Sequence, residues 1–103
     1  MSRLDEKSLY LKAIELWGAS SQLDQGVEEA AEFIQAINKW KRDTGIENAR
    51  RLIEEMVDLS IMIGQVKVLI VLQLGEDKVV RLFAEFKARK LRRLQKLLKG
   101  DPK

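Results

Sequence analysis

Cysteine and histidine are both absent from this chain of 103 residues. Without cysteine there is no disulfide framework and no thiolate chemistry. Without histidine the chain lacks the commonest general base and the usual ligand of zinc, copper and non-haem iron. Any metal ion would therefore be held by oxygen alone, which favours Mg²⁺ or Mn²⁺ over the softer transition metals.

Proline and long apolar runs are scarce as well. Pro102 is the single proline, and it lies beyond the last helical pattern. The most apolar run, residues 66–74, contains Lys67 and Gln73 and is far shorter than a membrane span. The first five residues lack the basic and apolar regions of a signal peptide. We therefore expect a cytoplasmic protein with no membrane contact.

The composition is that of a small globular protein. Hydrophobic residues make up 46% of the chain and charged residues 34%, which is typical of folded domains rather than disordered chains. The length predicts one domain over residues 1–103. Because so short a chain buries a limited core, we expect a homodimer or homotetramer.

Apolar residues recur at three- and four-residue spacing, which predicts an all-α four-helix bundle. The helices are expected at about 4–17, 20 or 21–42, 47–74 and 77–99. Ser20 or Ser21 should cap the second helix, and Gly75 and Gly100 should end the last two.

The third predicted helix contains one conflict. Residues 66–72 are rich in β-branched side chains and taken alone could form a strand. The apolar stripe from Leu52 to Ile70 continues through them without a change of phase, so we expect a helix. Gly64 within it costs about 1 kcal/mol relative to alanine and is expected to permit a close helix crossing.

Two acidic clusters are the most informative motifs: Glu28, Glu29 and Glu32, then Glu54, Glu55 and Asp58. Carboxylates three residues apart share one helix face, and two such pairs from neighbouring helices would converge on a site for a hard cation. Glu55 falls within an apolar stripe and should point inward, where a carboxylate is costly unless it is paired or binds a metal. From the residues alone, an inward Glu–Arg pair and a metal site are both open.

The order of several blocks between residues 17 and 98 resembles the short, single-domain MazG-like nucleotide pyrophosphohydrolases. The first half contributes Trp17-Gly18, Ser21-Gln22-Leu23, the first acidic cluster, residues 33–37, and Lys39 with Lys41-Arg42. The second half contributes Glu54-Glu55 with Asp58, then Ile61-Met62 and Gln65.

This resemblance implies Mg²⁺-dependent hydrolysis of a nucleoside or deoxynucleoside triphosphate to the monophosphate and pyrophosphate, with Mn²⁺ as a possible substitute. On the matching positions, Glu29, Glu32, Glu55 and Asp58 would be metal ligands. Glu28 would orient or deprotonate the attacking water, or act from outside the ligand set. These five residues are the catalytic candidates.

The charge is unevenly spread along the chain. Residues 1–75 carry 9 basic and 12 acidic side chains, whereas residues 76–103 carry 10 basic and 4 acidic ones. Lys87 and Lys90 lie nearest the apolar side of the last helix and are candidates for contact with the β- and γ-phosphates. The alternative for most of these cations is a solvated helix face.

Three other residues are candidates for nucleoside contact. Trp17 and Trp40 could stack on a base, although tryptophans on helices are more often core or interface residues. Asn38 could read a base edge, with an exposed helix end as the alternative. A rival function is a non-catalytic helical module that binds nucleic acid through residues 81–99. It is less favoured because it leaves the acidic clusters without a purpose.

Overall fold

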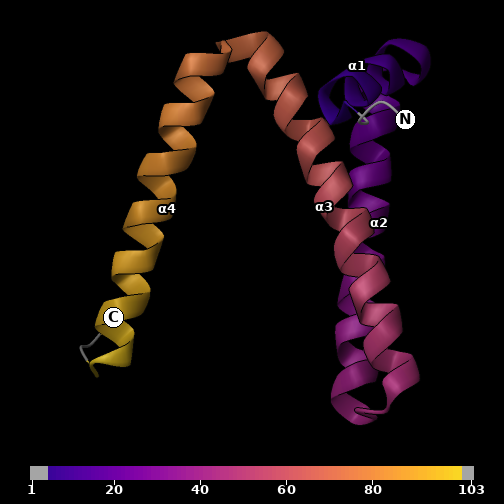
Figure 1. Ribbon diagram of the computed structural model, residues 1–103, viewed down its shortest axis with the longest axis vertical. Helices are drawn as coiled ribbons and strands as arrows, with labels where there is room; N and C mark the ends of the chain where they lie inside the picture. The colour runs from indigo at the N-terminus through magenta and orange to yellow at the C-terminus, as the bar shows by residue number, and fades with distance from the viewer. Residues whose placement is uncertain (1–4, 101–103) are drawn as a thin grey trace. The chain divides into compact units, whose positions relative to one another are not determined.

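The computed structural model describes residues 5–100, which form four helices and no strand (Figure 1). The helices are α1 (Glu6–Trp17), α2 (Ala19–Arg42), α3 (Ile46–Leu74) and α4 (Glu76–Leu98). The all-α, four-helix architecture predicted from apolar spacing is confirmed. Residues 66–72 lie within α3, so the helix prediction holds over the strand alternative. Residue 4, the predicted start of the first helix, lies outside the described residues.

The start of α2 differs from the prediction. The expected serine cap is wrong, because the helix begins at Ala19 and is preceded by Gly18, with no side-chain cap hydrogen bond. The Gly18 N–H donates to the Ile14 carbonyl at 2.8 Å while its φ is +87°, so one glycine both ends α1 and redirects the chain into α2. That backbone conformation is open to glycine at little cost.

The chain divides into two compact units, Met1–Leu69 and Ile70–Lys103. The first unit contains α1, α2 and most of α3, and the second contains the end of α3 and all of α4. Gly75, with φ +90°, separates α3 from α4 as predicted. The single domain over residues 1–103 stays a prediction.

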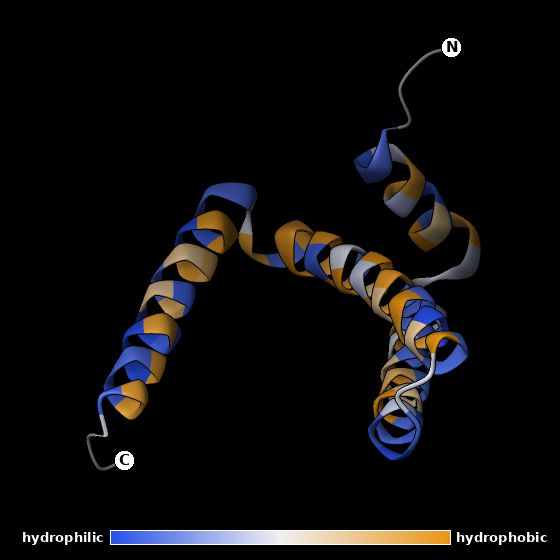
Figure 2. Ribbon diagram, turned by 60° about the horizontal axis from the view of Figure 1, so that its bottom comes forward, coloured by the Kyte–Doolittle hydropathy of each residue, from blue (hydrophilic) through white to orange (hydrophobic). Residues whose placement is uncertain are grey.

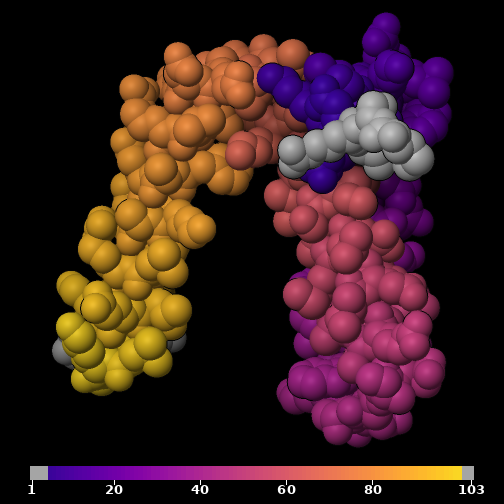
Figure 3. All heavy atoms as spheres, viewed as in Figure 1, coloured from indigo at the N-terminus to yellow at the C-terminus, as the bar shows by residue number. Residues whose placement is uncertain are grey.

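In the first unit, α2 and α3 form an antiparallel helical hairpin (Figures 1 and 3). The connection is fixed by Asp43, whose carboxylate accepts from the Gly45 N–H at 3.1 Å and whose carbonyl accepts from the Asn48 amide at 3.0 Å. The two helices pack closely at Gly26, where a Cβ would lie 3.8 Å from Val66 Cγ2, an ordinary contact. The hairpin brings the two acidic clusters onto neighbouring helices.

Helix α1 contacts α3 through Tyr10. A Cβ built on Gly64 would lie 2.7 Å from Tyr10 Cε2, which is closer than real side chains approach. The side chain of Tyr10 therefore occupies the space beside Gly64, and a close helix crossing there stays a prediction. Burial, together with the nearby Glu6 charge, raises the pKa of the Tyr10 hydroxyl above its usual value.

Helix α4 is amphipathic. Val79 is buried, whereas four other apolar residues of the helix are between 37% and 50% exposed: Phe83, Phe86, Leu94 and Leu97. Hydrophobic and hydrophilic residues alternate along its length in Figure 2. The Arg89 guanidinium lies 5.4 Å from the centre of the Phe86 ring, a cation–π distance.

Helix α3 is the one described helix that is long and apolar enough to cross a membrane by length and composition. Its most apolar stretch has a mean hydropathy of 1.8, with 11% of that stretch buried. Core helices of soluble proteins meet the same criterion, so this property alone does not identify a membrane protein.

Candidate metal centre

Three carboxylates from α2 and α3 converge in the first unit. Glu29 and Glu32 are one turn apart on α2, and Glu55 comes from the facing stretch of α3. One oxygen from each residue lies within 4.8 Å of the other two. Glu55 is only 4% exposed, so the inward orientation predicted from the apolar stripe is confirmed. Three of the four predicted metal ligands therefore meet.

Glu29 and Glu55 are each held by one oxygen while the other has no partner. Arg51 Nε donates to Glu55 Oε1 at 2.9 Å, and Gln25 Nε2 donates to Glu29 Oε1 at 2.9 Å. Glu29 Oε2 and Glu55 Oε2 are buried and accept no hydrogen bond. Buried polar atoms of this kind are uncommon and costly unless a ligand satisfies them.

The inward Glu–Arg pair foreseen as an alternative is also present. However, Arg51 engages one oxygen of Glu55, and its own side chain is 59% exposed. The pair therefore anchors the carboxylate without using its full capacity as an acceptor. An anchored carboxylate with one oxygen left over is suited to a second, cationic partner.

The electrostatics of the cluster also favour a cation. The charge of Glu29, followed by that of Glu55, raises the pKa of the Glu32 carboxyl above its ordinary value of 4.5. Like charges at this separation disfavour full ionisation. A divalent cation would remove that repulsion. Three carboxylates without nitrogen or sulfur ligands suit Mg²⁺, Mn²⁺ or Ca²⁺.

Asp58 and Glu28 lie outside this group of three. Both side chains are exposed. Asp58 follows Glu55 by three residues, which places it about 60° around the helix from the buried position. It is therefore on the rim of the cluster, and its assignment as a ligand stays a prediction.

The predicted nucleoside and phosphate contacts are dispersed. Trp17 is 62% exposed at the end of α1, and Trp40 is 40% exposed near the end of α2 beside the exposed Asn38. Lys87 and Lys90 are exposed on α4 and belong to the second unit. Their roles at the substrate stay predictions.

Two glutamines with notable polar environments were not foreseen as site residues. Gln25 orients Glu29, and the sequence offered a clue to it, since it precedes Glu29 by one helical turn. Gln65 has a buried Oε1 without a partner. Because Gln65 follows Asp58 by seven residues, about two helical turns, both lie on the same side of α3.

A polar cavity of about 420 Å³ lies at the turn end of the hairpin and is joined to the carboxylate cluster through Arg51. Its lining includes Lys39 from α2 and Arg50, Arg51 and Glu54 from α3. Arg51 lines the cavity and also contacts Glu55, and the cavity lining carries the carboxylates of Glu47 and Glu54 beside its three cations.

Comparison of the chain with protein-family models, with curated proteins and with solved structures finds no match. The geometry of the cluster and the sequence motifs therefore carry the functional argument.

Proposed function

We propose that this protein hydrolyses nucleoside or deoxynucleoside triphosphates to the monophosphate and pyrophosphate with the help of Mg²⁺. The observation that carries the proposal is the convergence of Glu29, Glu32 and Glu55, two of which keep a buried oxygen without a partner. The resemblance of the two acidic motifs to MazG-like pyrophosphohydrolases supports the same reaction.

The residues of the cluster fit a magnesium ion. Glu29, Glu32 and Glu55 would hold it, with Asp58 on the rim as a further ligand. When bound, the ion would neutralise triphosphate charge and polarise the phosphorus under attack. Mn²⁺ would serve in the same oxygen site.

The chain's own groups supply the remaining chemistry. Gln25 and Arg51 hold Glu29 and Glu55 in place, so little reorganisation is needed when a cation binds. Glu28 is exposed next to the cluster and can accept a proton from the attacking water, which does not require histidine. Lys39, Arg50 and Arg51 line the polar cavity that would take the negatively charged phosphates.

The test is pyrophosphate release from a panel of common nucleoside and deoxynucleoside triphosphates, with Mg²⁺ and with EDTA. We expect metal-dependent release from the wild type and its loss in Glu55→Gln. The matched control is Glu15→Gln, which makes the same change at an exposed residue of α1 outside the cluster and the polar cavity and should keep most activity. Failure to release pyrophosphate from any nucleotide by the folded wild type would refute the proposal for this panel.

A second candidate function is nucleic-acid binding by α4. The observation that favours it is a run of exposed cations without an intervening acid: Lys87, Arg89, Lys90, Arg92, Arg93, Lys96 and Lys99. Such binding would weaken steeply with added salt and would be unchanged in Glu55→Gln. A filter-binding titration at two salt concentrations, with wild type and Glu55→Gln, separates the two candidates.

A further inference from the structure

Helix α4 carries an exposed apolar stripe that is distinct from its buried side. Val80, Leu91 and Leu98 lie within about 20° of one another around the helix. They are 54%, 55% and 79% exposed. Leu94, which is 50% exposed, lies about 40° to one side of Leu98, whereas the buried Val79 is about 100° away from Val80. The stripe is therefore a surface that the described part of the chain leaves uncovered.

Exposed cations flank this stripe. Lys90 lies on one side of it, and Arg81, Arg92 and Lys99 lie on the other, at roughly 75–125° from its centre. Residues 86–99 carry seven basic and no acidic side chains, since the acidic residues of α4 all come earlier in the helix. The partner of this surface should therefore be anionic as well as apolar.

Lys87 interrupts the stripe, because it follows Val80 by seven residues, about two helical turns. A charged side chain in the middle of a dry contact between two helices is costly. At a membrane surface it is tolerated, since the aliphatic part of a lysine lies along the acyl chains while its ammonium group reaches the headgroups. The position of Lys87 therefore favours a lipid surface over an apolar protein groove.

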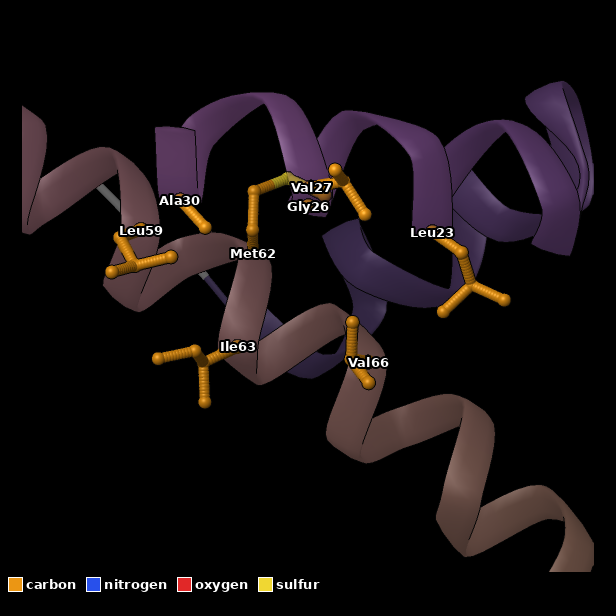
Figure 4. A pocket seen from close by; sticks show the side chains of 8 residues that line it. All are labelled: Leu23, Gly26, Val27, Ala30, Leu59, Met62, Ile63 and Val66. Carbon is orange, nitrogen blue, oxygen red and sulfur yellow. The ribbon is translucent and has the colours of Figure 1, made fainter. Parts of the chain in front are cut away.

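The apolar face of the α2–α3 hairpin has no such combination. A pocket of about 260 Å³ lies between the two helices (Figure 4), and Val27 and Ile63 in its lining are 72% and 52% exposed. None of the residues that line this pocket is charged. That face therefore gives no indication of the chemistry of an occupant, whereas the cations of α4 do.

We propose that α4 binds the surface of an anionic lipid bilayer. The helix lies in the plane of the interface, with Val80, Leu91 and Leu98 at the acyl boundary and the flanking cations on the headgroups. This binding goes beyond the proposed hydrolysis and does not depend on it. The expected absence of membrane contact was based on the lack of a spanning run and of a signal peptide, and a helix that lies on a surface needs neither.

Nucleic acid is the competing ligand for the same cations. A phosphate backbone would neutralise them but would leave the leucines of the stripe exposed to water. A lipid surface satisfies both the cations and the leucines. The two ligands therefore differ in whether the apolar stripe contributes to binding.

The test is co-sedimentation of the full chain with vesicles of equal parts phosphatidylglycerol and phosphatidylcholine, and with vesicles of phosphatidylcholine alone. We expect binding to the anionic vesicles only, weakened by added salt. Leu91→Gln should weaken this binding by at least about tenfold, because a buried apolar side chain is lost. The matched control is Leu16→Gln, the same change at a leucine of α1 that is 73% exposed, which should bind like wild type.

A second pair of variants tests the cations. Arg92→Gln/Lys99→Gln should weaken binding to the anionic vesicles by about thirtyfold, since each cation near an anionic surface strengthens binding by roughly fivefold. Lys12→Gln/Lys41→Gln removes the same net charge at exposed residues outside α4 and should have a much smaller effect. Equal losses in the two double variants would contradict binding through α4.

Wild type that does not bind the anionic vesicles, or that binds both kinds equally, overturns the proposal. Leu91→Gln that binds the vesicles as tightly as wild type also overturns it, as does binding to a DNA duplex or RNA without binding to vesicles. Circular dichroism checks that each variant is helical.

If Leu91→Gln does not fold, fluorophore-labelled single-cysteine variants replace it, because the natural chain contains no cysteine. A label at Leu91→Cys should shift its emission to shorter wavelength when anionic vesicles are added. A label at Arg89→Cys, about 160° around the helix, should not. Equal shifts at the two positions, or none at either, contradict the proposed orientation.

Discussion

The two sides of the α2–α3 hairpin are incomplete in opposite ways. One side buries carboxylate oxygens of Glu29 and Glu55 without a partner. The other exposes apolar side chains such as Val27 and Ile63 to water. Each state costs free energy, and each is relieved by a different class of ligand: a cation on the first side and apolar surface on the second.

The comparison teaches that burial and exposure must be considered together with residue type. A buried glutamate and an exposed isoleucine are ordinary by themselves. On one hairpin, both depart from the usual pattern, and they do so at different residues. We expect a change at the exposed Ile63 to leave a cation at the carboxylates bound.

The largest effect is expected when single carboxylates of the cluster are replaced. Glu29→Gln, Glu32→Gln and Glu55→Gln should each lower pyrophosphate release by about a hundredfold or more, because each loses a charge from the three-oxygen cluster. Asp58→Asn should lower the rate of pyrophosphate release less, and Glu28→Gln less again, since both residues are exposed outside the three-carboxylate cluster. Initial rates at saturating Mg²⁺ rank the five variants. Equal losses at Asp58 and Glu55 would instead favour four equivalent ligands.

A cation should also stabilise the fold, and the apolar face should not affect this. At 100 times its dissociation constant, Mn²⁺ should add about 2.7 kcal/mol to the free energy of unfolding, through binding to the native state alone. Thermal denaturation with and without Mn²⁺ measures the shift. We expect the shift in wild type and in folded Ile63→Glu, and its absence in Glu55→Gln. If Mn²⁺ no longer stabilises Ile63→Glu, cation binding depends on the apolar residues.

The packing of the helices in the first unit can be tested at two glycines. Gly64→Ala places a Cβ 2.7 Å from Tyr10 and should destabilise the protein by about 1–3 kcal/mol despite the better helix propensity of alanine. Gly26→Ala meets Val66 at 3.8 Å, an ordinary contact, and should be neutral or stabilising by up to about 1 kcal/mol. Urea denaturation gives both values. A stabilised Gly64→Ala variant would contradict the tight packing of Tyr10 against Gly64.

The smallest expected effect is a pH dependence of the metal-free protein. The folded state holds the Glu32 proton more tightly than the unfolded state, because the pKa of this carboxyl is raised by Glu29 and then Glu55. Its contribution to stability is full below the ordinary value of 4.5 and is lost as the pH rises through the raised pKa. Melting temperatures of wild type in EDTA should therefore fall relative to Glu32→Gln over that window. If the melting temperatures of the two proteins change with pH in parallel, Glu32 is not coupled to Glu29 and Glu55.

Much of the fold follows from spacing in the sequence. Apolar periodicity gave four helices, kept residues 66–72 helical and turned Glu55 inward, since all three depend on rotation within one helix. A packing reason for Gly64 was also predictable, because a glycine inside a helix loses stability without one. The identity of the crossing side chain, Tyr10, required the tertiary structure.

The remaining features depend on how two helices meet. Spacing places Asp58 about 60° from Glu55, but the position of α2 relative to α3 decides which carboxylates come within reach. The buried, unpartnered Oε1 of Gln65 likewise depends on tertiary packing, whereas the exposed Gln25 reaches Glu29 within one helix. The predicted start of α2 was wrong because two serines suggested a cap, whereas the positive φ of Gly18 determines the turn.

The Arg51–Glu55 pair has a further consequence for the order in which ligands bind. The guanidinium occupies one oxygen of Glu55 and also borders the polar cavity. A cation at Glu55 Oε2 would weaken the attraction between Glu55 and Arg51, and the guanidinium would then be more available to an anion in the cavity. The two ligands therefore assist each other through one shared side chain, and by thermodynamic reciprocity each should tighten the binding of the other by the same factor. A metal–polyphosphate complex satisfies both requirements in a single encounter.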